Sequence, residues 1–280
     1  MHRFFTLLRC SHPLPVAAVT AATTVLGISA GVGGRWPLVL ATVLLNQLSV
    51  GLANDYLDRE LDRRAGRKEK PLAVDEFPAG VTLAVAVAAG LGATGVSLLL
   101  GPPAAVAQLV MLVVAQAYNL GLKRTVFSAL PYAIAFGMIP LFLALTVQRL
   151  PQWWAVAAAA LLGAGAHFTQ SLSDIESDRA QGMWGLPARL GPGGSLAAAA
   201  LCLCVGAGLL VLGPGSSLSV PGRVAVGLTL LLTAAVVAVG RRGHPLLAFR
   251  INLAAAAMII AGLVLSGQSI LAPVSSSAAA

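Results

Sequence analysis

Charge is scarce in this chain. Charged residues make up 10% of its 280 positions, whereas hydrophobic residues make up 58%. Acidic residues are the rarer kind, ten in all against 18 lysines and arginines. Only three cysteines occur, Cys10, Cys202 and Cys204, and their spacing matches neither a disulfide framework nor a cysteine metal site. This composition excludes an ordinary soluble globular protein.

Long uncharged runs take up most of the chain, and polar and apolar residues do not alternate as they would in strands. Each run approaches the roughly 20 residues with which an α-helix crosses about 30 Å of hydrocarbon. We therefore predict an all-α, polytopic membrane protein, residues 1–280 forming one domain of nine transmembrane helices around a cytoplasm-facing cavity. The predicted spans are 13–32, 36–53, 80–100, 104–122, 126–147, 153–173, 195–212, 224–240 and 253–270.

The basic residues predict how these spans are oriented. With nine spans, Arg35, Arg149 and Arg223 fall on one side of the membrane and every other lysine and arginine falls on the opposite side. Cytoplasmic loops carry such an excess of positive charge, so we expect a multi-pass protein of the cell membrane with its N-terminus inside. Residues 1–12 then form a short cytoplasmic segment, and 273–280 a disordered tail. The formal net charge of +8 needs no nucleic-acid partner.

The acidic residues are confined to two windows, 55–76 and 174–178, which both face the cytoplasm in this arrangement. Asn54, Asp58 and Asp62 are spaced four residues apart, and Asp55 lies three residues before Asp58. If the preceding helix continues through them, their oxygens line one side of it. Carboxylates at that spacing repel one another near a membrane, so a cation is expected among them.

The residue types around the two windows favour a magnesium and diphosphate site. Mg²⁺ takes oxygen ligands from a few carboxylates and from substrate phosphates, and two such ions would clamp a leaving diphosphate. Nearby cations would neutralise the remaining charge, and the apolar helices would enclose an isoprenoid tail. We expect two Mg²⁺ ions, a prenyl diphosphate and an allylic cation formed in a dry pocket. The nearby cations are Arg67, Lys68, Lys70, Lys123 and Arg124.

Three polar residues inside the predicted spans accompany the windows. Asn46 follows the helical spacing above the acidic row, and Gln170 and His167 precede Asp174 by four and seven residues. Asn46 and Gln170 are expected to contact the residues that bind the ligand rather than the ligand itself, although Asn46 could equally bind a neighbouring helix. A lone histidine at this spacing is more often a satisfied interior residue than a ligand, and the sequence assigns His167 no role.

These residues resemble the motifs of the UbiA superfamily of intramembrane prenyltransferases. Asn54, Asp55, Asp58 and Asp62 match its N-D-x-x-D-x-x-x-D motif completely, and Asp174 with Asp178 matches its D-x-x-x-D motif. Its tyrosine–lysine signature is similar to Tyr118 and Lys123 with one extra residue between them. Further similar segments are Lys70-Pro71-Leu72 and the L-P-x-x-L-G pattern of residues 186–191. The chain departs from the family at Ser173, at residues 183–185, at Lys70 and at Val74-Asp75.

The resemblance implies a divalent-metal-dependent transferase that moves an isoprenyl group from a prenyl diphosphate to an aromatic or lipid acceptor in the bilayer. It implies metal ligands at Asn54, Asp55, Asp58, Asp62, Asp174 and Asp178, of which Asp58, Asp174 and Asp178 are catalytic. It implies diphosphate binding by Arg67, Lys70, Tyr118, Lys123 and Arg124. The departures affect the expected acceptor and the grip on the diphosphate rather than the metal ligands.

Three other functions compete with this one. A terpene cyclase of the same family would ionise the same diphosphate and close a ring. A membrane cation transporter would use the carboxylates as an ion path, but transporters place such charges near the bilayer midplane, beside broken helices. A phosphotransferase for nucleotide-activated alcohols would carry D-G-x-x-A-R, which is absent. Solvated acidic loops would show neither helical spacing nor confinement to two windows.

Overall fold

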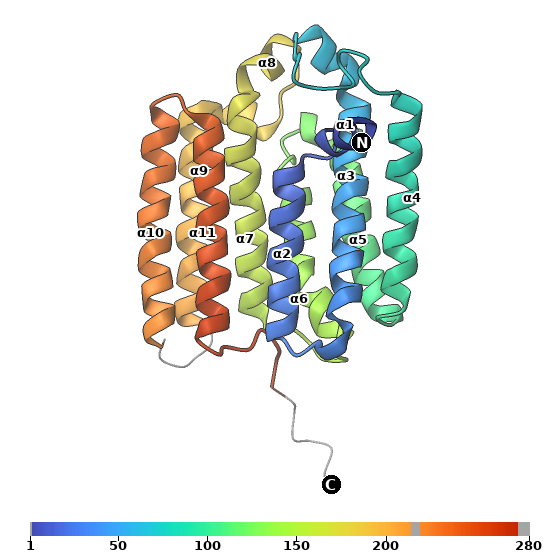
Figure 1. Cartoon of the computed structure of the whole chain (residues 1–280). Coiled ribbons are helices and arrows are strands. Elements are labelled where there is room, and N and C mark those ends of the chain that lie inside the picture. Colours follow the sequence, from blue (N-terminus) through green and yellow to red (C-terminus); the bar gives the residue numbers. More distant parts are fainter. Residues whose placement is uncertain (1, 214–218, 274–280) are drawn as a thin grey trace.

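The computed structural model describes residues 2–213 and 219–273. Helices run side by side through these ranges in one bundle (Figure 1), and the strand-like pairing there is an isolated bridge between Pro151 and Leu271. The long helices are α2 (Pro13–Ser29), α3 (Trp36–Arg64), α4 (Ala79–Leu98), α5 (Pro102–Leu120), α6 (Leu130–Thr146), α7 (Trp153–Gln170), α9 (Leu186–Leu212), α10 (Val220–Arg241) and α11 (Pro245–Leu265). Two short helices, α1 (His2–Arg9) and α8 (Ile175–Ala180), lie at one end of the bundle.

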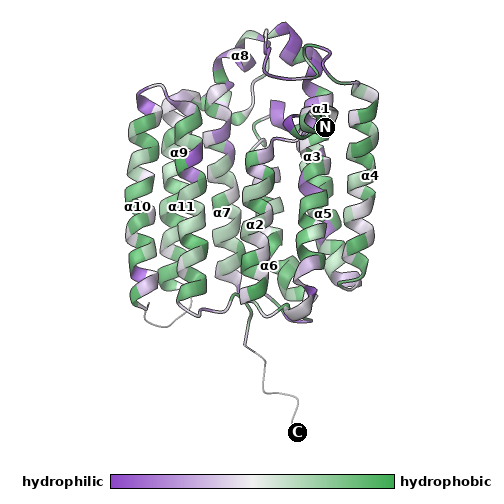
Figure 2. Ribbon diagram, viewed as in Figure 1, coloured by the Kyte–Doolittle hydropathy of each residue, from purple (hydrophilic) through white to green (hydrophobic). Residues whose placement is uncertain are grey.

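Seven of the long helices are long and apolar enough to cross a membrane, and α2 and α6 are apolar but only 17 residues long. The all-helical, membrane-spanning class is therefore confirmed, while the count of nine spans and the side that faces the cytoplasm stay predictions. Figure 2 shows hydrophobic residues along the flanks of the bundle and hydrophilic residues gathered at the end that carries α8. This distribution matches a bundle surrounded by lipid, with one polar end.

The acidic row lies on helix because α3 continues 29 residues without interruption from Trp36 to Arg64. Good helix formers fill its last turns, and Glu60 pairs with Arg63 at 3.3 Å and with Arg64 at 3.4 Å. Cationic side chains in the last turn also interact favourably with the helix dipole. The helix ends at Arg64, and Gly66, two residues later, has a φ of 68°, which a residue with a Cβ adopts at a cost.

Glycines bring the helices that carry the site into close contact. A Cβ on Gly51 of α3 would collide with the carbonyl oxygen of Ser11, so this glycine lets the start of α2 lie against α3. A Cβ on Gly163 of α7 would stand 2.6 Å from the carbonyl oxygen of Tyr132 on α6. Small residues allow this approach of backbones in membrane helices. The first contact places His12 beside the acidic row, and the second places His167 beside Tyr132.

The structure adds detail at three segments. The N-terminal segment predicted over residues 1–12 contains α1. The span predicted over residues 195–212 is the second part of α9, which begins earlier, at Leu186, and is kinked where Gly191 has a φ of 72° and Pro192 follows. The predicted disordered tail lies outside the described residues except for Pro273.

Candidate active site

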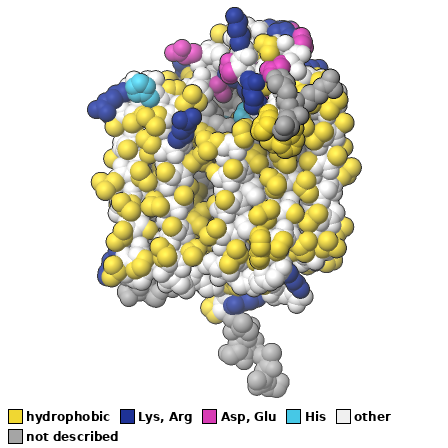
Figure 3. All heavy atoms as spheres, viewed as in Figure 1, with side chains coloured by type: hydrophobic (Ala, Val, Ile, Leu, Met, Phe, Trp, Pro, Cys, Tyr) yellow, Lys and Arg dark blue, Asp and Glu magenta, His cyan; other side chains and the backbone are white. Residues whose placement is uncertain are grey.

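A cavity of about 780 Å³ lies where the two acidic windows meet. Figure 3 shows acidic and basic side chains around a hollow at this end of the molecule, next to a flank covered by hydrophobic side chains. Deeper in the bundle the walls of the cavity become apolar. The apolar residues that line it include Val19, Met111, Ala115, Phe136, Ile139 and Leu253.

The polar residues of α3 point in two directions. Asn54, Asp58 and Asp62 line the cavity, as their four-residue spacing predicts. Asp55 is not among the lining residues, and its side chain is only 1% exposed. The predicted row therefore supplies two carboxylates and one amide to the cavity and keeps its fourth member behind them.

Asp55 holds two basic side chains at the cavity edge. Its Oδ1 atom lies 2.5 Å from Nζ of Lys70 and 3.0 Å from Nε2 of His12, and these two nitrogens lie 3.1 Å apart. A buried carboxylate needs such partners, because an unpaired buried charge is strongly unfavourable. Asp55 thus connects the start of α2 and the loop after α3 to the middle of α3. His12, which directly precedes Pro13, was not assigned to the site from the sequence, because an interfacial histidine with no evident partner more often has no role.

The second acidic window forms its own short element. α7 ends at Gln170, a single 3₁₀ turn follows, and Asp174 stands at the N-terminal boundary of α8. Asp174 and Asp178 both line the cavity. Burial, together with the neighbouring charge of Asp174, raises the pKa of Asp178 to about 6. Because the helix breaks before Asp174, Gln170 does not continue on the same helical face as that carboxylate.

Arg67 joins the two acidic windows. Its Nη1 lies 3.1 Å from Oδ1 of Asp62, and its Nη2 lies 2.6 Å from Oδ1 of Asp174. Burial alone would lower the pKa of the guanidinium, but Asp174 and Asp62 together raise it. Carboxylates that lie 112 residues apart in sequence, at positions 62 and 174, therefore flank a single planar cation.

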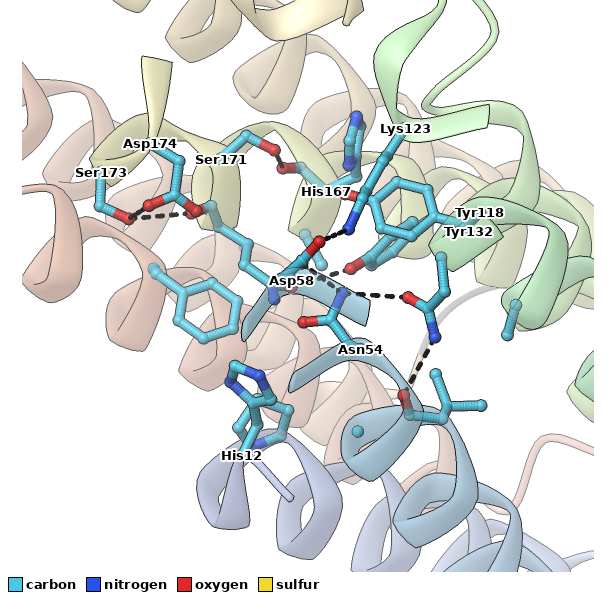
Figure 4. A pocket seen from close by; sticks show the side chains of 18 of the residues that line it. His12, Asn54, Asp58, Tyr118, Lys123, Tyr132, His167, Ser171, Ser173 and Asp174 are labelled. Carbon is cyan, nitrogen blue, oxygen red and sulfur yellow. Dashed lines mark hydrogen bonds and ion pairs between the residues drawn. The ribbon is translucent and has the colours of Figure 1, made fainter. Parts of the chain in front are cut away.

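Lys123 reaches Asp58 from the turn that follows α5. Its Nζ forms an ion pair with Oδ1 of Asp58, while Oδ2 accepts a hydrogen bond from Asn54 Nδ2 at 3.1 Å. Asn54 Nδ2 also lies 3.1 Å from Oδ1 of Asn119, whose own amide donates to the carbonyl of Val50 at 3.0 Å. Figure 4 shows Asp58 with Lys123 and Asn54 on either side of it. Asn119 was missed by the sequence analysis, although it directly follows the predicted Tyr118.

Aromatic and imidazole rings form the wall behind Lys123. The rings of Tyr118 and Tyr132 meet edge to face with centroids 5.1 Å apart, and the ring of His167 lies 4.9 Å from that of Tyr132. Tyr132 donates a hydrogen bond to Gln170 Oε1 at 3.1 Å. Gln170 therefore supports an aromatic wall rather than Asp174. Nε2 of His167 lies 3.0 Å from Oγ of Ser128, so His167 is an interior residue with a partner.

Of the remaining predicted site residues, Asn46 lines the cavity and Arg124 does not. Asn46 lines the cavity on α3 and is 2% exposed. Arg124 is exposed and is not among the cavity-lining residues, unlike its neighbour Lys123. Asp75 belongs to the Val74-Asp75 segment, at which the chain departs from the family's usual glycine. It has a φ of 56° and forms an ion pair with Arg63 at 2.7 Å. Aspartate tolerates this left-handed conformation better than most residues.

The cavity offers an all-oxygen donor set of the kind that Mg²⁺ prefers. Four of its carboxylates come in two pairs, Asp58 with Asp62 and Asp174 with Asp178, and Glu69 is a fifth. Across residues 2–213 and 219–273, no three histidine, cysteine or acidic side chains converge as a ready-made metal site. Arg67 and Lys123 lie between the carboxylates instead. The residues fit Mg²⁺ on the condition that substrate phosphate oxygens complete its coordination.

Comparison with known proteins gives a family and a fold. A model of the UbiA prenyltransferase family matches residues 14–254. The apo structure of a UbiA homolog from Aeropyrum pernix K1 has 24% sequence identity and a TM-score of 0.74, over 89% of this chain and 98% of that chain. A search of curated proteins found no match.

Two further solved structures share the fold at lower identity. A UbiA homolog from Archaeoglobus fulgidus bound to GPP and Mg²⁺ has 17% identity and a TM-score of 0.72, over 93% of this chain and 99% of that chain. A digeranylgeranylglyceryl phosphate synthase has 14% identity and a TM-score of 0.71, over 95% of this chain and 99% of that chain. At these identities the likeness shows the fold alone.

Proposed function

The chain belongs to the UbiA prenyltransferase family, and on that premise we propose that it transfers an isoprenyl group from a prenyl diphosphate to an aromatic or lipid acceptor. The reaction depends on Mg²⁺ and takes place at the cytoplasmic side of the cell membrane. The Archaeoglobus fulgidus homologs bound to DMAPP or GPP together with Mg²⁺ support this class of substrate.

One observation carries the proposal: both acidic windows border a single cavity, and Arg67 connects them. Asp62 and Asp174 lie within hydrogen-bonding distance of the same guanidinium. The carboxylates of both windows would hold the metal that a diphosphate requires here, and the basic side chains would bind the remaining phosphate charge. Both windows lie at the same end of the bundle, which favours this function over a cation path through the membrane.

The metal ligands in this proposal are Asn54, Asp58, Asp62, Asp174 and Asp178. Bound Mg²⁺ would neutralise the diphosphate and make it a better leaving group. Asp55 is turned away from the cavity, so we assign it the role of holding Lys70 in place. When the diphosphate binds, some of the hydrogen bonds to carboxylates are replaced by hydrogen bonds to phosphate oxygens. The donors are Arg67, Lys70 and Lys123.

The apolar part of the cavity holds the isoprenoid tail and excludes water. The bond between C1 of the prenyl group and the diphosphate oxygen breaks, and its electron pair leaves with the diphosphate. The resulting allylic cation lies near the rings of Tyr118 and Tyr132, whose π-electrons stabilise positive charge. The acceptor then forms a bond to C1 and loses a proton.

Mass spectrometry of the products formed by the purified protein tests this function. The protein is incubated with Mg²⁺, prenyl diphosphates of several lengths and a panel of lipophilic acceptors. Asp58→Ala and Asp174→Ala should each abolish product formation, as should EDTA. Glu176→Gln is the matched control, because Glu176 lies in the second window but is exposed and does not line the cavity. Turnover that persists in EDTA or in either aspartate variant would contradict the proposal.

A further inference from the structure

Arg250 stands apart from the other charged residues of the cavity. It is the one charged residue of the apolar helix α11, which spans Pro245–Leu265. It lies five residues after the start of that helix, about 8 Å along its axis. It lines the cavity together with Leu246, Phe249 and Leu253, which occupy the same side of α11 at helical spacing.

The other lysines and arginines that line the cavity are matched with acids. Arg67 pairs with Asp62 and Asp174, Lys70 with Asp55, and Lys123 with Asp58. Arg250 forms no hydrogen bond or ion pair with any residue in the described ranges. Arg250 is exposed, so it needs no protein partner, but it lines the cavity as a cation whose hydrogen-bonding groups are free to bind a ligand.

A role in orienting the chain in the membrane is the simpler explanation for a cation near a helix end. Arg241 and Arg242 at the end of α10 fit that explanation, because neither lines the cavity, although all three arginines are exposed. Arg250 differs from them in facing the same cavity as the acidic windows. The two arginines of α10 therefore serve as controls for charge alone.

The inference rests on the proposed function and concerns its acceptor: we propose that Arg250 binds an anionic group, a carboxylate or a phosphate, on the acceptor molecule. Guanidinium groups bind both kinds of anion through two parallel hydrogen bonds. The acidic windows repel an anionic acceptor, and every other cavity cation is already engaged with them. Arg250 is the place in the described cavity where such a group is attracted without competing for the diphosphate.

The surroundings of Arg250 suit an acceptor with an apolar body. The cavity reaches from α11 to α2, where Leu14, Val16 and Val19 also line it, and the two helices are in contact. An acceptor held by its anionic end at Arg250 can lay its apolar part between Phe249 and Val19. Its reactive end then extends into the same chamber as the tyrosine wall.

Binding measurements on the full-length protein in dodecyl maltoside test this inference. The probes are dodecyl phosphate, laurate and uncharged dodecanol, each added with Mg²⁺ and geranyl diphosphate present. Arg250→Gln should weaken binding of at least one anionic probe about tenfold or more, as expected for loss of a charge-assisted hydrogen bond, and leave dodecanol unchanged. Arg250→Lys should lose less. Which anionic probe responds identifies the group as phosphate or carboxylate.

Geranyl diphosphate binding separates failure of this inference from failure of the proposed function. Arg250→Gln should bind geranyl diphosphate with Mg²⁺ as the original protein does, and Arg241→Gln should behave normally with every probe. An Arg250→Gln variant that binds both anionic probes undiminished would overturn the inference, as would equal losses in Arg241→Gln. Loss of geranyl diphosphate binding in Arg250→Gln would place Arg250 in the diphosphate site instead. Absence of such binding in the original protein would count against the proposed function itself.

Discussion

Gly185 and Lys123 meet so closely that a Cβ on the glycine would collide with the carbonyl oxygen of the lysine. The contact ties the segment before α9 to the turn after α5. Ser128 strengthens it, since its Oγ accepts a hydrogen bond from the backbone amide of Leu186 at 3.1 Å and lies 3.0 Å from Nε2 of His167. The position of Lys123 beside Asp58 therefore depends on residues of the segment that follows the second acidic window.

Gly185→Ala is expected to displace the Lys123 turn. The added methyl group should destabilise the protein by about 1–3 kcal/mol, as overpacking does, and raise the KM for prenyl diphosphate more than it lowers kcat. Thermal unfolding and steady-state kinetics measure the two effects. Gly193→Ala is the control, because a Cβ at Gly193 meets no atom within 4 Å. A Gly185→Ala variant with unchanged KM would show that this contact does not position Lys123.

Lys123 and Arg124 are neighbours, but only the loss of Lys123 is expected to change the KM. Lys123→Ala should raise the KM for prenyl diphosphate roughly tenfold, because it removes a charge-assisted hydrogen bond. Arg124→Ala should leave the KM unchanged, since Arg124 is exposed and does not line the cavity. Steady-state kinetics at saturating Mg²⁺ distinguishes the two. Equal effects in both variants would mean that only the local positive charge matters.

Arg67 is expected to be the most sensitive of the basic residues. Arg67→Ala removes the cation between Asp62 and Asp174, so the carboxylates repel one another and the diphosphate loses a two-armed partner. The KM of Arg67→Ala should rise about tenfold or more, as expected for the loss of a charge-assisted hydrogen bond. Arg67→Lys should recover only part of this loss, because an ammonium group cannot bind both carboxylates as the guanidinium does. Arg64→Ala is the control, because the acidic partner of Arg64 among the described residues is the exposed Glu60. Full recovery by lysine would contradict the bridging role.

The orientation of the bundle is open to direct measurement. In a variant without Cys10, Cys202 and Cys204, a cysteine at position 65 should react with an impermeant maleimide only from the cytoplasmic side. A cysteine at position 216 should react only from outside. The expectation follows from the distribution of basic residues. Labelling in the reverse pattern would invert the topology and place the site on the outer side.

The sequence predicted those parts of the site that follow from spacing along one helix. Asn54, Asp58 and Asp62 line the cavity because α3 does not break, and confinement of the acids to two windows predicted that the windows would meet. The resemblance to the UbiA family is confirmed by the family match over residues 14–254.

Contacts between distant segments could not be predicted in the same way. Nothing in the local sequence shows that Asp55 would turn towards His12, because that contact depends on Gly51 allowing Ser11 to lie against α3. Asn119 pairs with Asn54 across two helices, and Arg124 differs from Lys123 only by the direction in which a short turn presents it. The assignments of metal ligands and of diphosphate contacts stay predictions.

The length of α3 has a consequence for how the by-product leaves. Its 29 residues extend about 44 Å, whereas the hydrocarbon layer is about 30 Å thick. The last turns, which carry Asp58 and Asp62, therefore project into the polar zone beyond the acyl chains. In the proposed reaction, pyrophosphate released between them would enter water on the side from which the substrate headgroup arrived, while the apolar prenyl chain would stay within the hydrocarbon layer.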